Sequence, residues 1–219
     1  HVLMRSIVTE WYETKENVNE MEHLESSHLK KWELTVAKLF PEKSKILDVG
    51  CGLGREAFLL SDMGFVVTGI DISHEVITRV TALSSEKGYD ITFKWYDGHK
   101  LPFENNSFDA VIIWAQTFGL LYGDEYKHEL LSECKRVLTT DGLLSFSGHD
   151  YGFEMDNYKE YMKGRRFYPY ADAKIYWETF DSNELIRFAE DTGYTVLLCE
   201  KGEIYKPEDG TVLHCLCRK

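Results

Sequence analysis

The stretch Lys45-Ile-Leu-Asp-Val-Gly-Cys-Gly-Leu-Gly54 decides the fold. Its apolar run predicts a buried parallel strand, and the alternating glycines Gly50, Gly52 and Gly54 predict the tight turn that leaves it. Glycine tolerates positive φ and has no Cβ, so a ligand can lie directly against the backbone there. Residues 55–63 continue as a helical pattern, whose first N–H groups would point at the same ligand. The stretch predicts a nucleotide-type site at the carboxyl end of a strand.

The glycine spacing separates two kinds of cofactor site. A dinucleotide fingerprint needs Gly-x-Gly-x-x-Gly, and Arg55 stands where its third glycine should be. With Asp48 two residues before Gly50, the stretch instead resembles motif I of the class I S-adenosylmethionine-dependent methyltransferases, hydrophobic-x-Asp-hydrophobic-Gly-x-Gly-x-Gly. A glycine turn can also serve tight packing alone, so the rest of the chain has to decide.

A second apolar, β-branched run over residues 65–70 ends at Asp71. A carboxylate about 20 residues after the glycine turn, at the tip of the neighbouring strand, is placed to accept hydrogen bonds from ribose hydroxyls. Asp71 could instead cap the helix expected at 74–87, but Ser73 fills that role equally well. We therefore expect Asp71, with Ile72 beside it, to contact the cofactor.

Two further strands extend the resemblance over about residues 40–150. Residues 91–95 lead into Asp97-Gly98, where the family places an acidic residue that faces the adenine amino group. Residues 108–114 follow a turn signal, and in the family the end of this strand touches the methyl donor. The resemblance thus implies S-adenosylmethionine as cofactor and S-adenosylhomocysteine as product. The cofactor-binding residues expected on this basis are Asp48, Gly50, Gly52, Gly54, Asp71, Ile72, Asp97, Gly98, Trp114 and Gln116.

Composition favours one soluble globular domain. The chain has 219 residues, of which 43% are hydrophobic and 28% charged, and both fractions are ordinary. With 37 acidic and 25 basic residues the net charge is −12. A protein that grips a phosphate backbone usually carries a basic stripe, and the short run at 163–166 is too small to provide one. We expect a small-molecule partner and no nucleic acid.

The cysteines and the hydropathy pattern bear on location. The five cysteines are odd in number and show no Cys-x-x-Cys spacing, so we expect no metal site. Cys199, Cys215 and Cys217 fall in expected strands and are predicted to be free thiols, which favours a reducing compartment. No apolar run approaches about 18 residues and no charged-then-apolar leader is present, so we expect no membrane partner. A cytoplasmic location follows by elimination.

Strands and helices alternate, which predicts a parallel sheet covered on both faces. The resemblance implies an α/β, Rossmann-like doubly wound sheet of seven mostly parallel strands, with an antiparallel last strand between the fifth and sixth. We expect a single domain over 1–219, with residues 1–40 as an N-terminal helical cap. The expected helices are 17–39 (ending before Pro41), 55–63, 74–87, 125–138 and 182–192, and the last three strands are 142–148, 195–199 and 211–217.

Residues 151–180 contain ten aromatic side chains. In the resembled fold this connection lies over the carboxyl ends of the strands, beside the transferable methyl, where such folds keep their specificity. An aromatic insertion that covers the acceptor site and an aromatic helix packed on the sheet edge are equally favoured. Aromatic faces could hold a planar substrate or a cationic amine. The substrate-binding candidates are Trp11, Tyr12, Tyr151, Tyr158 and Tyr161.

Methyl transfer from a sulfonium is an in-line displacement, so the protein mainly has to align the nucleophile with the leaving sulfur. Some acceptors also need a proton removed. His149 is the first candidate for that role because imidazole accepts a proton near neutral pH, and Tyr151 is the second. His149 could equally hydrogen-bond its own loop.

Three functions remain open at this stage. Residues 114–118 lack the Asn/Asp-Pro-Pro-Tyr/Phe signature, which disfavours nucleobase and glutamine methylation. The pattern resembles the small-molecule branch of the family, close to the quinone-biosynthesis type, and predicts an enzyme that methylates a small molecule. The alternatives are a dinucleotide-dependent oxidoreductase on a similar sheet and a non-catalytic module that binds the cofactor or its product.

Overall fold

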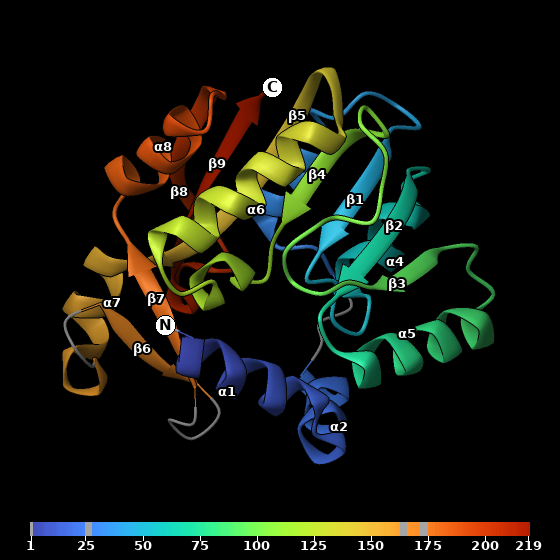
Figure 1. Cartoon of the computed structure of the whole chain (residues 1–219). Helices are drawn as coiled ribbons and strands as arrows, with labels where there is room; N and C mark the ends of the chain where they lie inside the picture. Colours follow the sequence, from blue (N-terminus) through green and yellow to red (C-terminus); the bar gives the residue numbers. More distant parts are fainter. Residues whose placement is uncertain (1, 25–27, 163–165, 171–174) are drawn as a thin grey trace.

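The computed structural model describes residues 2–24, 28–162, 166–170 and 175–219 (Figure 1). The helices and single 3-10 turns are α1 (Val2–Glu13), α2 (Lys15–Leu24), α3 (Lys31–Ala37), α4 (Arg55–Asp62), α5 (His74–Lys87), η1 (Thr117–Leu120), α6 (Asp124–Val137), α7 (Tyr151–Tyr158), η2 (Lys159–Tyr161), α8 (Ser182–Asp191) and η3 (Pro207–Asp209). The strands are β1 (Lys45–Val49), β2 (Val66–Asp71), β3 (Thr92–Trp95), β4 (Phe108–Ile113), β5 (Leu138–Asp150), β6 (Phe167–Tyr170), β7 (Ile175–Phe180), β8 (Thr195–Glu203) and β9 (Thr211–Arg218).

The sheet has the predicted doubly wound topology. Strands β3, β2, β1, β4 and β5 lie side by side in that order and are all parallel. The last strand, β9, runs antiparallel between β5 and β8. These seven strands confirm the Rossmann-like prediction. In the part of the chain that the structure describes, the hairpin strands β6 and β7 extend this sheet to nine strands.

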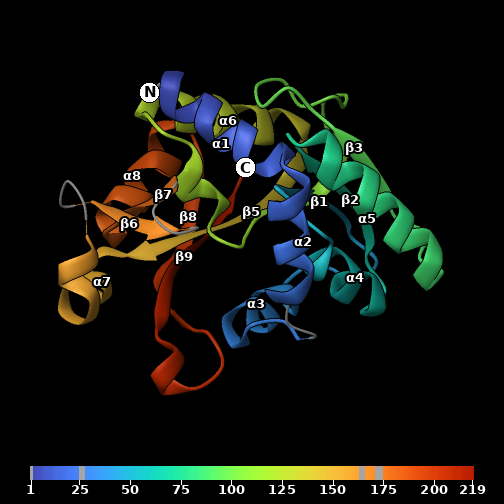
Figure 2. The same ribbon diagram turned by 90° about the horizontal axis from the view of Figure 1, so that it is seen from below.

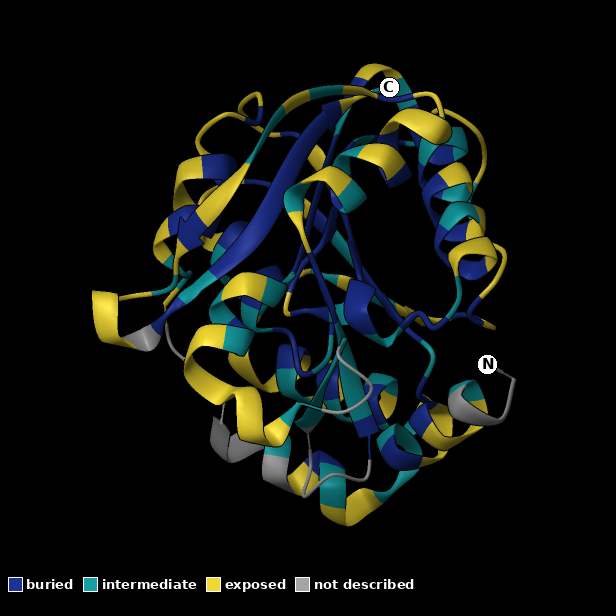
Figure 3. Ribbon diagram, turned by 90° about the vertical axis from the view of Figure 1, so that its left-hand side faces the viewer, coloured by how far each residue is buried: buried dark blue, intermediate teal, exposed yellow. Residues whose placement is uncertain are grey.

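Helices cover both faces of this sheet because the central strands carry apolar residues on both of their faces (Figures 1 and 3). Leu47 and Val49 belong to the cluster formed with α6 and α8. Ile46, which points to the opposite face, belongs to the cluster formed with α3 and α4. Burial on both sides fixes the register of β1 and thereby places the glycine turn at the carboxyl edge of the sheet.

The N-terminal segment differs from the single helix expected at 17–39. Helix α2 ends at Leu24, and α3 begins at Lys31. The new start has a local cause, because the Lys30 backbone N–H donates to Glu33 Oε1 at 2.7 Å and is satisfied outside a helix. Helix α1 lies within the helical cap expected over 1–40, although no separate helix was expected before residue 17.

Helices α1 and α2 together bridge two parts of the sheet's carboxyl edge (Figure 2). Val8 and Trp11 of α1 pack in one cluster with Tyr122 and Ile175. Val18 of α2 belongs to another cluster, which includes Leu53 of the glycine turn and Val76 of α5. The two helices therefore span from the β7 side of the fold to the glycine turn.

The 151–180 insertion is a short helix followed by a hairpin, not one aromatic helix. Helix α7 and turn η2 precede β6 and β7, which pair antiparallel. β7 also pairs in parallel with the end of β5, where His149 faces Thr179 and Asp150 faces Phe180. Aromatic and β-branched residues fit a pleated surface, which explains the strands. Residues 163–165 and 171–174 of the predicted insertion lie outside the described residues.

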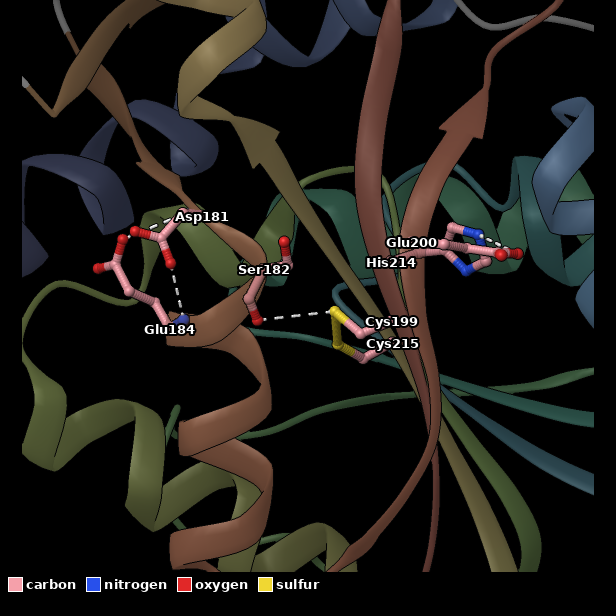
Figure 4. The surroundings of a disulfide bond; sticks show 7 residues. All are labelled: Asp181, Ser182, Glu184, Cys199, Glu200, His214 and Cys215. Carbon is pink, nitrogen blue, oxygen red and sulfur yellow. Dashed lines mark hydrogen bonds and ion pairs between the residues drawn. A yellow bond between two sulfur atoms is a disulfide. The ribbon is translucent and has the colours of Figure 1, made fainter.

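The prediction of free thiols in the last strands was wrong for one pair. Cys199 and Cys215 are direct partners on β8 and β9 and are joined by a disulfide (Figure 4). A cross-strand pair brings two side chains of one face together, and sequence spacing gave no sign of it. Cys51, Cys134 and Cys217 are free and buried. Among the described residues, no helix is long and apolar enough to cross a membrane.

Candidate active site

A cavity of about 560 Å³ lies at the carboxyl edge of the sheet. Its wall combines the glycine turn, the ends of β2, β4 and β5, helix α1, helix α7 and the β6–β7 hairpin. Such an edge is where open α/β sheets bind ligands. The predicted site residues that line it are Tyr12, Gly50, Gly52, Asp71, Ile72, Gln116, His149 and Tyr158.

Asp71 is held against the glycine turn. Its Oδ2 accepts a hydrogen bond from the Gly52 backbone N–H at 3.1 Å, and its Oδ1 accepts one from the Ser73 N–H at 3.1 Å. Ser73 is the cap of α5, since its hydroxyl accepts from the Val76 N–H. Burial raises the pKa of the Asp71 carboxyl group to about 6, against the lowering effect of these hydrogen bonds.

The three motif glycines have different surroundings. All have positive φ, a conformation that favours glycine. A Cβ on Gly50 would lie 2.6 Å from the Thr117 side chain, and a Cβ on Gly54 would lie 2.8 Å from the Phe58 ring. Gly50 thus allows the turns after β1 and β4 to approach each other. Gly54 lies outside the cavity lining and allows close packing on α4 and α5.

The turn after β4 carries backbone strain at the cavity wall. Ala115 and Gln116 have φ values of 54° and 65°, which are uncommon for residues with a side chain. Gln116 is 5% exposed, and its Oε1 has no hydrogen-bond partner among the described residues. Strain and an unsatisfied buried group together are typical of a site that awaits a ligand.

Other predicted cofactor contacts are not in the cavity lining. Asp48 is buried behind the turn, and burial, followed by the neighbouring Glu56, raises its pKa well above the usual value. The Asp97 carboxylate is exposed and accepts from the backbone of His99 and Lys100. Gly98 is buried, and its carbonyl accepts from the Tyr126 hydroxyl.

Trp114, expected among the cofactor contacts, does not line the cavity. Trp114 is fully buried in the cluster formed with α3 and α4, and its Nε1 donates to Ser145 Oγ at 2.9 Å. Side chains alternate between the two faces of a strand, and the Trp114 ring lies on the face that packs against α3 and α4. The cavity is lined instead by the residues that follow, Ala115 to Thr117.

Three substrate candidates also lie away from the cavity lining. Trp11 is buried in the cluster with Tyr122, while its neighbour Tyr12 lines the cavity. Tyr151 is covered by the Arg166 guanidinium, 4.7 Å from its ring centroid, and Tyr161 is 53% exposed.

A group of charged side chains at the glycine turn was missed from the sequence. Arg55 donates to both carboxylate oxygens of the fully buried Glu33, at 2.8 and 2.7 Å, and lies 3.2 Å from Glu56. Lys30, Arg55 and Glu56 line the cavity. Burial lowers the pKa of the Lys30 ammonium group. Charged residues at helix starts are common on surfaces, so only the fold shows that these surround a cavity.

The other end of the cavity is aromatic. Phe153, Tyr158, Tyr168 and Trp177 line it and are called the aromatic wall below. His149 lies against this wall, with ring centroids 4.6 Å from Trp177 and 5.9 Å from Tyr168. Its Nδ1 is 3.3 Å from Oε1 of Glu154. His149 and Tyr158 were predicted from the sequence, whereas the other three rings were not, because ten aromatic residues in one segment gave no basis for choice.

This geometry places a carboxylate, a glycine turn and a strained loop around one cavity, and the sequence comparisons agree with it. Residues 46–142 match the sequence model of the methyltransferase domain family. Over these residues the chain is similar to methyltransferase domains. Among the described residues, no group of three or more His, Cys, Asp or Glu side chains could hold a metal ion.

Individual relatives extend the match beyond the family core. A Bacillus subtilis protein named as a methyltransferase, YqeM, is 28% identical over 82% of this chain and 70% of its own length. The 2-methyl-6-phytyl-1,4-hydroquinone methyltransferase of Synechocystis is 36% identical over 48% of this chain and 31% of its own. The match thus spans less than a third of the second relative.

A solved structure shows the same fold over the whole chain. The 1,6-didemethyltoxoflavin-N1-methyltransferase of Burkholderia thailandensis, with S-adenosylhomocysteine bound, aligns with a TM-score of 0.70 at 18% identity. The alignment covers 100% of this chain and 88% of that one. At this identity the likeness establishes the fold of this chain and nothing about an acceptor.

Proposed function

We propose that this protein is a class I methyltransferase that transfers the methyl group of S-adenosylmethionine to a small-molecule acceptor bound at the aromatic wall. The observation that carries the proposal is the hydrogen bond from the Gly52 N–H to Asp71 at one end of a cavity whose other end is aromatic. The cofactor would lie on the glycine turn, with its ribose hydroxyls donating to Asp71. Ile72 and Gln116 would flank it. Asp48 and Gly54 would support the turn from behind, and Asp97 and Gly98 would close the adenine end.

The charged side chains at the turn suit the amino-acid end of the cofactor. A carboxylate would be held by Lys30, and an ammonium group by Glu56, since both side chains line the cavity next to Gly52. Arg55, fixed by Glu33, would keep Glu56 in place. When bound, the cofactor supplies an activated methyl group. The protein's own task is then to align the acceptor and exclude competing geometries.

The acceptor would meet His149 as its proton acceptor. Glu154 lies beside Nδ1, and this arrangement would stabilise the imidazolium form once the proton has moved. A small-molecule acceptor is supported by the hydroquinone named for the Synechocystis relative and by the net charge of −12, which disfavours nucleic acid. Tyr151 is a weaker catalytic candidate because Arg166 covers it.

We also propose that residues 1–219 act as one domain, with 1–40 as a helical cap and 151–180 as a cover over the acceptor. The cavity residues contributed by α1, α7 and the hairpin support this division. A cytoplasmic location remains a proposal as well. It was based on the expectation that the cysteines are free thiols. The disulfide between Cys199 and Cys215 argues against a reducing compartment, whereas the three free cysteines agree with one.

Calorimetric titration with S-adenosylmethionine, S-adenosylhomocysteine and NADH tests the cofactor site. We expect both methionine-derived ligands to bind and NADH not to. A methyl-transfer screen over phenols, amines, thiols and carboxylates then tests the acceptor class, with His149→Asn expected to lower turnover at least tenfold without changing cofactor affinity. Cofactor binding without transfer to any acceptor class would favour a non-catalytic binding module.

A further inference from the structure

The aromatic end of the cavity also holds a buried carboxylate with an unused oxygen. Glu154 is 5% exposed, and its Oε1 lies 3.3 Å from His149 Nδ1. Its Oε2 is buried and has no hydrogen-bond partner among the described residues. A buried carboxylate is costly unless it is paired and hydrogen-bonded. The free oxygen therefore indicates a ligand that brings a donor or a positive charge.

The rings of the aromatic wall form a continuous series that leads to His149, the partner of Glu154. Ring centroids are 6.1 Å apart for Phe153 and Tyr158, and 5.7 Å apart for Tyr158 and Tyr168. Tyr168 and Trp177 both lie against His149. The faces of aromatic rings carry negative potential and attract cations, most strongly where water is excluded. The wall and Glu154 therefore favour the same sign of ligand charge.

No described lysine or arginine on this side of the cavity competes for Glu154. The cavity residues contributed by β5, α7, β6, β7 and β9 include no Lys or Arg. Arg5, on α1, donates to the Tyr122 carbonyl and lies over the Tyr126 ring. Asp150, the neighbour of His149, lies outside the cavity lining and is held by Lys201 at 3.5 Å and by the Gly152 N–H.

We propose that the acceptor is an amine, bound in its ammonium form between Glu154 and the aromatic wall. This inference rests on the proposed function and narrows its acceptor class. Aromatic rings alone would suit a neutral planar acceptor equally well. Glu154 decides for a cation, because a neutral acceptor without a donor, or an anionic one, would leave its buried Oε2 without a partner.

The reaction then needs one proton transfer before the displacement. The ammonium group gives a proton to Nε2 of His149, which has no hydrogen-bond partner among the described residues. Glu154 stabilises the imidazolium ion that results. The freed lone pair forms the N–C bond to the methyl carbon while the C–S bond breaks, and the electron pair of that bond stays on sulfur. The product is an N-methylammonium ion, S-adenosylhomocysteine and protonated His149.

Three probes of similar shape and different charge test the inference on the unmodified protein. Benzylamine, benzyl alcohol and benzoate are titrated calorimetrically into protein saturated with S-adenosylhomocysteine at pH 7.5. We expect benzylamine to bind at least tenfold more tightly than benzyl alcohol, and benzoate not to bind. Equal or tighter binding of benzyl alcohol, or binding of benzoate, would overturn the amine proposal.

Variants then assign the preference to residues. Glu154→Gln keeps the shape and removes the charge, and should weaken benzylamine at least tenfold while benzyl alcohol and S-adenosylhomocysteine change less than twofold. Tyr168→Leu should weaken benzylamine about fivefold. The matched control Glu160→Gln, at an exposed site in η2, should change nothing. An equal loss for both probes in Glu154→Gln would mean a structural role and would refute the assignment.

The two levels of the proposal fail separately. If S-adenosylhomocysteine does not bind, the proposed function falls and the amine inference falls with it. If it binds and the probes show no preference for the cation, the amine inference alone is wrong, and methyl transfer to another acceptor class stands.

Discussion

The Gly52 backbone N–H donates to the Asp71 carboxylate at 3.1 Å, which ties the turn after β1 to the tip of β2. The parallel register of β1 and β2 brings them together, and the Ile70 carbonyl also accepts from the N–H groups of Gly50 and Cys51. The glycine turn and the carboxylate that were predicted separately from the sequence thus form one rigid unit. A carboxylate already oriented by two backbone donors needs little reorganisation when a ribose arrives.

Replacement of Asp71 by asparagine should weaken S-adenosylhomocysteine roughly ten- to hundredfold. The substitution removes the charged acceptor, and a hydrogen bond to a charged group contributes about 1.5–3 kcal/mol. The amide also cannot accept from both backbone donors in the same way. Calorimetry measures the affinity, and thermal unfolding checks that the variant folds. Asp62→Asn, at an exposed position on α4, is the matched control. Unchanged affinity in a folded Asp71→Asn variant would remove this residue from the site.

Cofactor affinity should fall as the pH drops from 7 to 5. Burial raises the pKa of Asp71 to about 6, so the carboxyl group is largely protonated at pH 5 and accepts hydrogen bonds poorly. We expect affinity for S-adenosylhomocysteine to fall about tenfold over that range. The raised pKa also means that Asp71 lowers folding stability as the pH rises from 3.8 to about 6, because the folded state binds the proton more tightly. A pH profile that is the same in Asp71→Asn would assign the effect to another group.

The sequence predicted the elements whose pattern is local. The apolar strands, the glycine turn after Val49 and the helix over 74–87 follow from period, turn chemistry and capping, and the structure has them within a few residues. Asp71 was identified because its distance from the turn is fixed by one helix and one strand. These features depend on residues close together in the chain.

Features that depend on long-range contacts were missed. The pairing of β7 with β5 and the disulfide of Cys199 with Cys215 require segments to meet whose sequences show no sign of each other. Trp114 was assigned to the site because of its position after a strand, while its side chain direction is decided by the apolar cluster on the other face. Glu154 was not singled out from the sequence, because only the fold buries it beside His149.

A side chain at Gly50 should destabilise the fold by contact with one partner. Its φ is 75°, and a Cβ would lie 2.6 Å from the Thr117 side chain. Gly50→Ala should lower the free energy of unfolding by roughly 2–3 kcal/mol, of which the positive φ accounts for about 1–2 kcal/mol. Thr117→Ala in the same chain should recover the part due to the contact. Urea unfolding of both single variants and the double variant measures the coupling. Strictly additive losses would show that the two turns do not meet in this way.

Only three of the five cysteines should react with iodoacetamide in the denatured, unreduced protein. Cys51, Cys134 and Cys217 are free, while Cys199 and Cys215 are joined. Mass spectrometry counts the labels, and prior reduction should raise the count to five. Reduction should also lower stability by roughly 3 kcal/mol, because the bond closes a loop of 16 residues. Five labels without reduction would show that Cys199 and Cys215 are free thiols, as expected from the sequence.

The cap and the insertion should move together as a cover over the acceptor. Val8 and Trp11 of α1 pack with Ile175 of β7, so opening one displaces the other. Helix α7 has one described buried residue, Glu154, so its amides have few buried contacts to protect them. Hydrogen exchange should be fast in α1 and in residues 151–162 of the free protein. It should slow at least tenfold in both when S-adenosylhomocysteine and benzylamine are bound, because ligands that contact both walls favour the closed state. Exchange in the β1 and β4 amides, which lie in the sheet centre, should be slow throughout and provides the internal control. Strong protection of α1 and α7 in the free protein would mean a rigid roof, and the acceptor would then have to enter by another route.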